Sequence, residues 1–98
     1  MTKRSDIEEA ILRIAPDIPP FEAGAIADHA ADSRGLQPAS PEAAAWLSMV
    51  AFVRHVLTDY DALLEEGYDQ ESARHFVATD IQAVLSEWGV RRLLTQQD

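Results

Sequence analysis

The sequence contains no cysteine, which excludes disulfide bonds, thiolate metal ligands and a thiol nucleophile. It has only four glycines and no glycine-rich loop that could cradle a phosphate group. It has eight lysine and arginine residues but 17 aspartate and glutamate residues, so the formal net charge is -9. A chain of this charge repels nucleic acid backbones and anionic membrane surfaces. We therefore expect no nucleic acid and no membrane as partner, and instead a protein with a basic surface.

The sequence also lacks a long uninterrupted hydrophobic run. Its longest apolar stretch, residues 43–57, contains Ser48, Arg54 and His55 and is shorter than the ~20 residues that a membrane-spanning helix needs. At the start of the chain, acidic residues occupy the place where a signal peptide would have its apolar segment. These features predict a cytoplasmic protein.

What the sequence does contain is a helical pattern. Apolar residues recur every three or four positions, and no segment alternates apolar and polar residues as a half-buried strand does. With 98 residues, of which 47% are hydrophobic, the chain has the size of one domain. The sequence predicts an all-α fold, a compact bundle of about five helices in a single domain over residues 1–98, with frayed ends at 1–4 and 95–98.

The first two predicted helices lie in the N-terminal third. Ser5 and Glu8 have capping-box spacing, which places the first helix at residues 6–15. The second helix is expected to begin at Pro20 and to end at Gly35, since glycine tolerates a left-handed backbone. We expect it to lie at the outside of the bundle and to turn three side chains inward, namely Phe21, Ala25 and Ile26.

The third predicted helix forms the centre of the core and begins at Ser40-Pro41, a strong start signal. Its expected inward face comprises Trp46, Met49, Val50, Val53, Val56 and Leu57. Thr58 and Asp61 repeat the capping-box spacing, so residues 41–66 form either one bent helix or two helices, with Gly67 as the stop.

The last predicted helix is long, capped by Asp69 and ended by Gly89, and Val90 to Leu94 are expected to pack back on it. Its inward stripe comprises Ala73, Val77, Ile81, Val84, Leu85 and Trp88. Because Trp46 and Trp88 lie on the inward stripes of the two longest helices, we expect the two tryptophans to contact each other.

Polar side chains are concentrated where the most apolar helix ends. The candidate functional cluster comprises Arg54, His55, Thr58, Asp59, Tyr60, Asp61, Arg74 and Asp80. A structural explanation is preferred: Thr58 or Asp59 caps a helix and the ring of Tyr60 packs. In the same explanation Asp80, which borders the last apolar stripe, pairs with Arg54 or His55.

A metal site is disfavoured by the spacing of possible ligands. His55 and Asp59 are four residues apart, as two ligands on one helix face can be, but zinc needs at least three protein ligands and His29 and His75 lie on other segments. The acidic residues of 59–71 do not fit a calcium loop, because leucines stand at positions that need an oxygen ligand and a glycine. We therefore predict no metal and no cofactor, and interpret residues 59–71 as a solvated acidic surface.

Several parts of the chain resemble a bacterial family catalogued as domain of unknown function 2293. The resemblance covers residues 36–92 and is carried by Ala44 to Leu47, Arg54-His55, Thr58 to Leu64, Gly67 to Asp69, Ala73-Arg74 and Val84 to Trp88. Its most specific element is the pattern Arg-His-x-x-Thr-Asp-Tyr-Asp. The family implies no reaction, cofactor or catalytic residue, but it marks six positions for inspection: Arg54, His55, Thr58, Tyr60, Asp61 and Arg74.

Two functions of different classes follow from these observations. We favour a small module that acts through protein contacts at its acidic surface. The alternative is a small metal-dependent or acid/base hydrolase that uses Arg54, His55, Asp59, Tyr60 and Asp61. Because no nucleophile or metalloprotease motif accompanies this cluster, we do not expect an enzyme. Imitation of nucleic acid by negative charge is disfavoured, and the sequence leaves the oligomeric state open.

Overall fold

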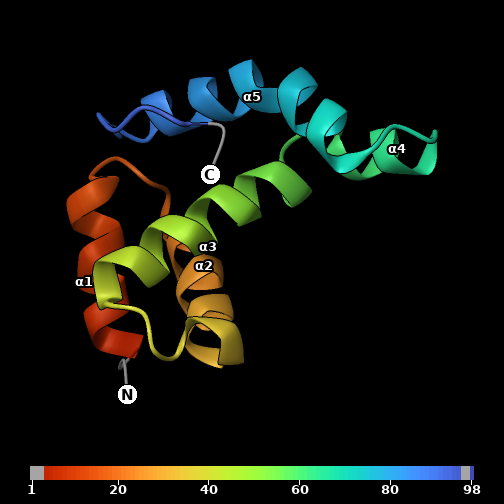
Figure 1. Cartoon of the computed structure of the whole chain (residues 1–98). Helices are drawn as coiled ribbons and strands as arrows, with labels where there is room; N and C mark the ends of the chain where they lie inside the picture. The colour runs from red at the N-terminus through yellow and green to blue at the C-terminus, as the bar shows by residue number, and fades with distance from the viewer. Residues whose placement is uncertain (1–3, 96–97) are drawn as a thin grey trace.

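Five α-helices and one short 3-10 helix make up the computed structural model, which describes residues 4–95 and 98 (Figure 1). In chain order they are α1 (Arg4–Ile14), α2 (Pro20–Asp32), η1 (Arg34–Leu36), α3 (Pro41–Val56), α4 (Tyr60–Glu65) and α5 (Gln70–Glu87). The described residues contain no strand, so the predicted all-α fold is confirmed. Each described helix is too short or too polar to cross a membrane.

The helices are arranged as a packed body with a projecting arm (Figure 1). α1, α2 and α3 pack against one another, and α5 lies across α3. The far end of α5 is tied to the α1–α2 connection, where the Asp17 amide donates to the Trp88 carbonyl oxygen over 2.9 Å. α4 joins the outer ends of α3 and α5 and projects beyond the body. We call residues 59–71 the acidic arm and the rest of the fold the body.

The core lies in the body, where α3 is its central helix. Eight of the 16 residues of α3 are buried. The largest side chains with almost no exposure are Ile7, Ile11, Ile26, Trp46, Met49, Val50, Val53, Ile81 and Leu85. Burial of one such aliphatic side chain stabilises the fold by about 1.5–3 kcal/mol. Trp46 and Trp88 are both buried, but among the described residues they form no aromatic ring pair, and the guanidinium of Arg92 covers the Trp46 ring instead.

The predicted helix starts and stops are mostly confirmed. The Ser40 hydroxyl accepts from the Ala43 amide over 3.1 Å, and the Asp69 carboxylate accepts from the Ser72 amide over 2.7 Å. Gly67 and Gly89 end α4 and α5 with φ of 106° and 82°, a region that suits glycine. Residues 41–66 form two helices, because the chain bends between Val56 and Tyr60.

Several predicted inward positions are wrong. Phe21 is 78% exposed, because it lies on the side of α2 opposite the buried Ile26. Val56 is 60% exposed and Leu57 is also exposed, because α3 extends here beyond the helices that cover its other turns. Gly35 does not adopt a left-handed backbone; it lies in η1, and α2 already ends at Asp32.

Both ends of the chain were predicted to fray, and the structure describes part of each end. Arg4 belongs to α1, so this helix begins two residues before the predicted start. Val90 is buried and Leu94 packs against the core, as predicted, whereas Leu93 is exposed. Asp98 makes hydrogen bonds to three other residues. The other residues predicted to fray, 1–3 and 96–97, lie outside the described part of the chain.

Candidate functional site

The junction between α3 and α4 is held by the hydroxyl of Thr58. This hydroxyl donates to the carbonyl oxygen of Arg54 and accepts from the amide of Tyr60 over 3.2 Å. It thereby satisfies one carbonyl at the end of α3 and one amide at the start of α4. The residue before α4 is Asp59, whose side chain makes no capping hydrogen bond. The predicted structural role of Thr58 is confirmed, but the capping box with Asp61 is not formed.

His55 pairs with Asp61 and not with Asp59. His55 Nδ1 and Asp61 Oδ1 lie 2.7 Å apart, and both side chains are about half exposed. The imidazole meets the buried ring of Tyr60 edge to face, with 5.2 Å between the ring centroids. A carboxylate at Nδ1 orients the imidazole and leaves Nε2 for another partner. Three of the candidate residues are therefore brought together at the surface of the junction.

Arg54 is the one buried charged residue of the cluster, with 7% of its surface exposed. Its Nη2 donates to the main-chain oxygen of Asp98, its guanidinium lies 5.7 Å from the centroid of the Tyr60 ring, and its Nε has no hydrogen-bond partner. Burial and then the positive charge of Arg74 lower the pKa of Arg54, whereas interactions with Tyr60 and Asp98 act in the opposite direction without reversing the shift. The guanidinium is thus held in a poorly solvated place without a carboxylate partner for its Nε.

Asp80 does not join this cluster. It is exposed, and among the described residues neither Arg54 nor His55 forms an ion pair with it. The predicted pairing is wrong, because Asp80 lies beside the buried stripe of α5 on a face that looks to solvent. Arg74 does share a site with Arg54: both line an open groove of about 1220 Å³ along α5. The other lining residues are Gln70, Glu71, Ser72, His75, Phe76, Ala78, Thr79, Ile81, Gln82, Ala83, Ser86, Leu94, Thr95 and Asp98.

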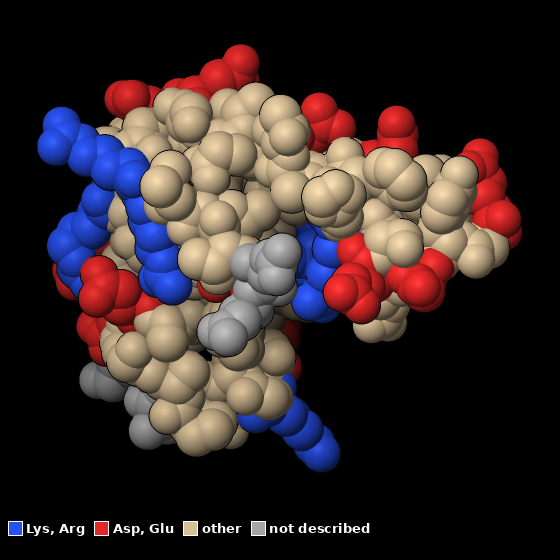
Figure 2. Space-filling model, turned by 45° about the horizontal axis from the view of Figure 1, so that its top comes forward, with Lys and Arg blue, Asp and Glu red and all other residues tan. Residues whose placement is uncertain are grey.

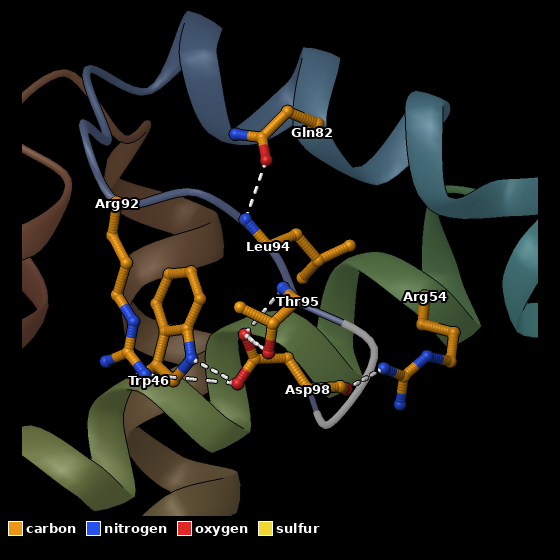
Figure 3. A network of polar contacts seen from close by, with 7 residues as sticks. All are labelled: Trp46, Arg54, Gln82, Arg92, Leu94, Thr95 and Asp98. Carbon is orange, nitrogen blue, oxygen red and sulfur yellow. Dashed lines mark hydrogen bonds and ion pairs between the residues drawn. The ribbon is translucent and has the colours of Figure 1, made fainter.

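A second polar network, not predicted from the sequence, is centred on Asp98 (Figure 3). One carboxylate oxygen accepts from Trp46 Nε1 over 3.0 Å, and the other accepts from the amide and hydroxyl of Thr95. Arg92 stacks on the Trp46 ring, 4.2 Å from its centroid, and lies 3.9 Å from Asp98. Burial alone would raise the pKa of Asp98, but the bonds from Trp46 and Thr95 and the charge of Arg92 hold the pKa below its usual value.

The only sequence signal for this network was the indole N–H of Trp46. A buried tryptophan normally finds an acceptor for this group, but its identity does not follow from spacing. Asp98 is 52 residues away in the chain. The amide of Leu94 also donates to Gln82 on α5 over 2.8 Å, so the segment around residues 92–95 is held along the groove by side chains of two helices.

The acidic arm carries exposed carboxylates at Asp59, Asp61, Glu65, Glu66, Asp69 and Glu71. Figure 2 shows acidic side chains distributed over the projecting part of the molecule. Within the described residues only two of the six have partners: Asp61 pairs with His55, and Asp69 accepts from Ser72, which lowers the pKa of Asp69. No group of three or more His, Asp or Glu side chains in residues 4–95 and 98 is arranged to hold a metal ion.

An exposed aromatic pair lies beside these carboxylates. Tyr68 and Phe76 are 44% and 57% exposed, and their rings meet nearly perpendicularly with centroids 5.3 Å apart. Tyr68 follows α4 and Phe76 lies two turns into α5, so the pair spans the base of the acidic arm.

Comparison with known proteins identifies the family. Residues 10–89 match the family described as "Uncharacterized conserved protein (DUF2293)". The chain belongs to this family. The resemblance seen in the sequence is therefore confirmed. No curated protein and no solved structure matches the chain. The matched region of this DUF2293 protein includes the junction cluster and Arg74, whereas Arg92 and Asp98 lie beyond it.

Proposed function

We propose that this DUF2293 protein is a helical module that binds a basic protein through the acidic arm. The observation that carries the proposal is the combination of exposed carboxylates on the projecting arm, most of them unpaired among the described residues, with the exposed Tyr68–Phe76 pair at its base. Aromatic side chains are enriched at protein interfaces and supply much of their binding energy, while charged residues at the rim select the partner. The arm and the adjoining turns of α5 present both kinds of residue.

The charge of the arm determines the kind of partner. Glu65, Glu66 and Glu71 have no cationic partner among the described residues. Their field attracts a basic surface and speeds encounter with it. Because all of them are exposed to solvent, the attraction decreases as salt is raised. We expect binding that is fast at low ionic strength and clearly weaker at high ionic strength.

A charge-reversal pair tests the electrostatic part. Glu65→Lys/Glu66→Lys removes two exposed carboxylates that have no partner within residues 4–95 and 98, so we expect the fold to stay intact. The matched control is Glu9→Lys/Glu87→Lys, which changes the net charge equally at two exposed, unpaired positions outside the arm. A basic partner captured from native extract should bind the arm variant at least about tenfold more weakly than the control. Equal loss in both variants would show that net charge alone is responsible, and the proposal would be withdrawn.

The aromatic part is tested separately. Tyr68→Ala removes one ring of the exposed pair and leaves the charge of the arm unchanged. If the pair anchors the partner, the variant loses about 2 kcal/mol of binding free energy, as an interface hot spot does. The matched control is Phe21→Ala, because Phe21 is an even more exposed ring on α2. Calorimetry with the captured partner should show unchanged affinity for the control.

One observation favours hydrolysis as a second candidate function. The His55–Asp61 pair, at 2.7 Å, has the arrangement in which a carboxylate orients a general base. Within the described residues, however, no hydroxyl group is hydrogen-bonded to His55. An enzyme that used this pair would lose hydrolysis of an activated ester in His55→Gln, and zinc would shift the NMR signals of His55 and Asp61 together at sub-millimolar concentration. Unchanged signals and activity equal to His29→Gln would exclude this candidate.

A further inference from the structure

We infer that Arg54 of α3 and Arg74 of α5 form an oxyanion-binding site that takes a carboxylate or phosphate group of a small ligand. The site lies at the groove along α5, whose lining includes Glu71 of the acidic arm and Phe76 of the aromatic pair, but its two arginines lie outside the arm. Its test measures anion binding and not partner capture, so it can fail or succeed separately from the proposed function.

The first observation is the state of Arg54. A buried guanidinium is normally paired with a carboxylate and has its donors satisfied, since an unmet buried donor costs free energy. Arg54 is 7% exposed, and among the described residues its guanidinium donates to the main-chain oxygen of Asp98 while its Nε finds no acceptor. Nε and one terminal nitrogen form the edge of the guanidinium that binds carboxylate and phosphate with two parallel bonds. The Nε donor of this edge is unused but buried, and the Arg54 side chain lines the groove.

The second observation is the neighbouring cation. Arg74 lines the same groove, and its charge is close enough to disfavour the charged form of Arg54. Among the described residues Arg74 forms no ion pair, although the chain has more than twice as many acidic as basic residues. Asp98 offsets part of this repulsion, and a bound anion that contacts both guanidinium groups would offset more of it.

The acidic side chains that line the groove do not bridge Arg54 and Arg74. The carboxylate of Asp98 is bound by Trp46 and Thr95, so it is directed away from Arg54 while its main-chain oxygen faces the guanidinium (Figure 3). Glu71 lines the groove one turn before Arg74 but forms no ion pair with either arginine. Figure 2 shows basic side chains next to acidic ones where the arm leaves the body.

The rest of the groove indicates the size and polarity of the ligand. Its volume of about 1220 Å³ exceeds what a bare ion needs. Ser72 and Thr79 offer hydroxyl donors for the remaining oxygens, whereas Phe76 and Ile81 offer apolar surface. A small organic acid or phosphate ester with an apolar portion fits this lining.

The side chain of Arg54 provides a direct readout. Its Nε–H is buried and therefore exchanges slowly with water, so it should give a resolved 15N–1H NMR signal in the full-length protein. We would titrate inorganic phosphate and, separately, N-acetylaspartate against this signal at constant ionic strength maintained with chloride. The expected result is a saturable shift of the Arg54 signal with at least one of the two probes, and the tighter probe identifies the preferred oxyanion.

Matched variants separate the site from general charge effects. Arg74→Gln removes an exposed side chain that forms no ion pair in the described part of the chain, and it should weaken binding about tenfold, the loss expected for one charge-assisted hydrogen bond. Arg34→Gln removes the same charge from exposed η1 and should leave the affinity unchanged. No saturable shift with either probe, or equal weakening in both variants, would overturn the inference.

Discussion

The body and the acidic arm are both helical, but they differ in how much of each helix is buried. In the body, α3 buries eight of its 16 residues and is covered by α1, α2 and α5. In the arm, α4 buries only Tyr60 of its six residues. Hydrophobic burial is the main stabilising term in folding, so most of the stability must come from the body. The comparison indicates that the arm contributes less to stability than the body does.

The arm keeps its shape through a few local devices. A six-residue helix is too short to be stable alone, because one or two turns do not repay the cost of helix nucleation. Thr58 joins the end of α3 to the start of α4, Tyr60 packs into the body, and Gly67 turns the chain toward α5. The body is stabilised by many weak contacts, whereas the shape of the arm depends on Thr58, Tyr60 and Gly67.

Cavity-forming substitutions should separate the two regions most strongly. Ile11→Ala empties a fully buried site in α1 and should lower the free energy of unfolding by about 3 kcal/mol. Leu64→Ala in α4 removes a partly exposed side chain and should cost about 1 kcal/mol or less. Urea denaturation followed by circular dichroism measures both. Similar losses in the two variants would mean that the arm is part of the same core.

The two left-handed glycines offer a second contrast. Alanine at Gly89 or at Gly67 must adopt positive φ, which costs about 1–2 kcal/mol at either site. At Gly89 the new methyl group would also meet an Asp17 oxygen at 2.9 Å and the Pro16 ring at 3.1 Å, whereas at Gly67 nothing lies within 4 Å. We expect Gly89→Ala to be more destabilising by about 1 kcal/mol. A larger loss at Gly67 in thermal unfolding would contradict the packing of α5 on the α1–α2 connection.

A pH series tests how the body holds Asp98. Because the folded pKa of Asp98 is lowered, its ionised form stabilises the fold above the unfolded pKa of about 3.9, and this contribution is lost as pH falls through the folded value. Asp98→Asn should therefore be less stable than the parent at pH 7, by about 1 kcal/mol or less. The difference should disappear in strong acid. A constant difference from pH 7 to pH 2 would show that charge is not involved.

The smallest effect is expected for the ion pair of the arm. Asp61→Asn breaks the contact with His55, but both side chains are about half exposed and solvated. The unfolding free energy should change by less than about 0.5 kcal/mol, as for other surface pairs. The test is denaturation at neutral pH beside Asp80→Asn, an exposed carboxylate without a partner among the described residues. A loss of more than about 1 kcal/mol in unfolding free energy would show that this ion pair stabilises the fold more than an exposed pair normally does.

Local signals in the sequence predicted local features well. Ser40, Asp69, Gly67 and Gly89 each act within one turn of their own position, so their roles could be assigned without knowledge of the fold. Phe21, Val56 and Leu57 were assigned wrongly to the core because helical spacing gives a face but not the helix that covers it. The same limit applied to the site: Arg54 contacts Asp98 and His55 contacts Asp61, in place of the predicted pairing of one of them with Asp80.

The amino-acid sequence by itself determined the helical class, the acidity, the family and most helix ends, because propensity, capping and charge depend on neighbouring residues. Only the tertiary structure decided that α4 projects as an arm, that Arg54 and Arg74 meet at one groove, and that Asp98 reaches Trp46. These contacts join residues far apart in the chain. They depend on how whole helices pack, which no local pattern specifies.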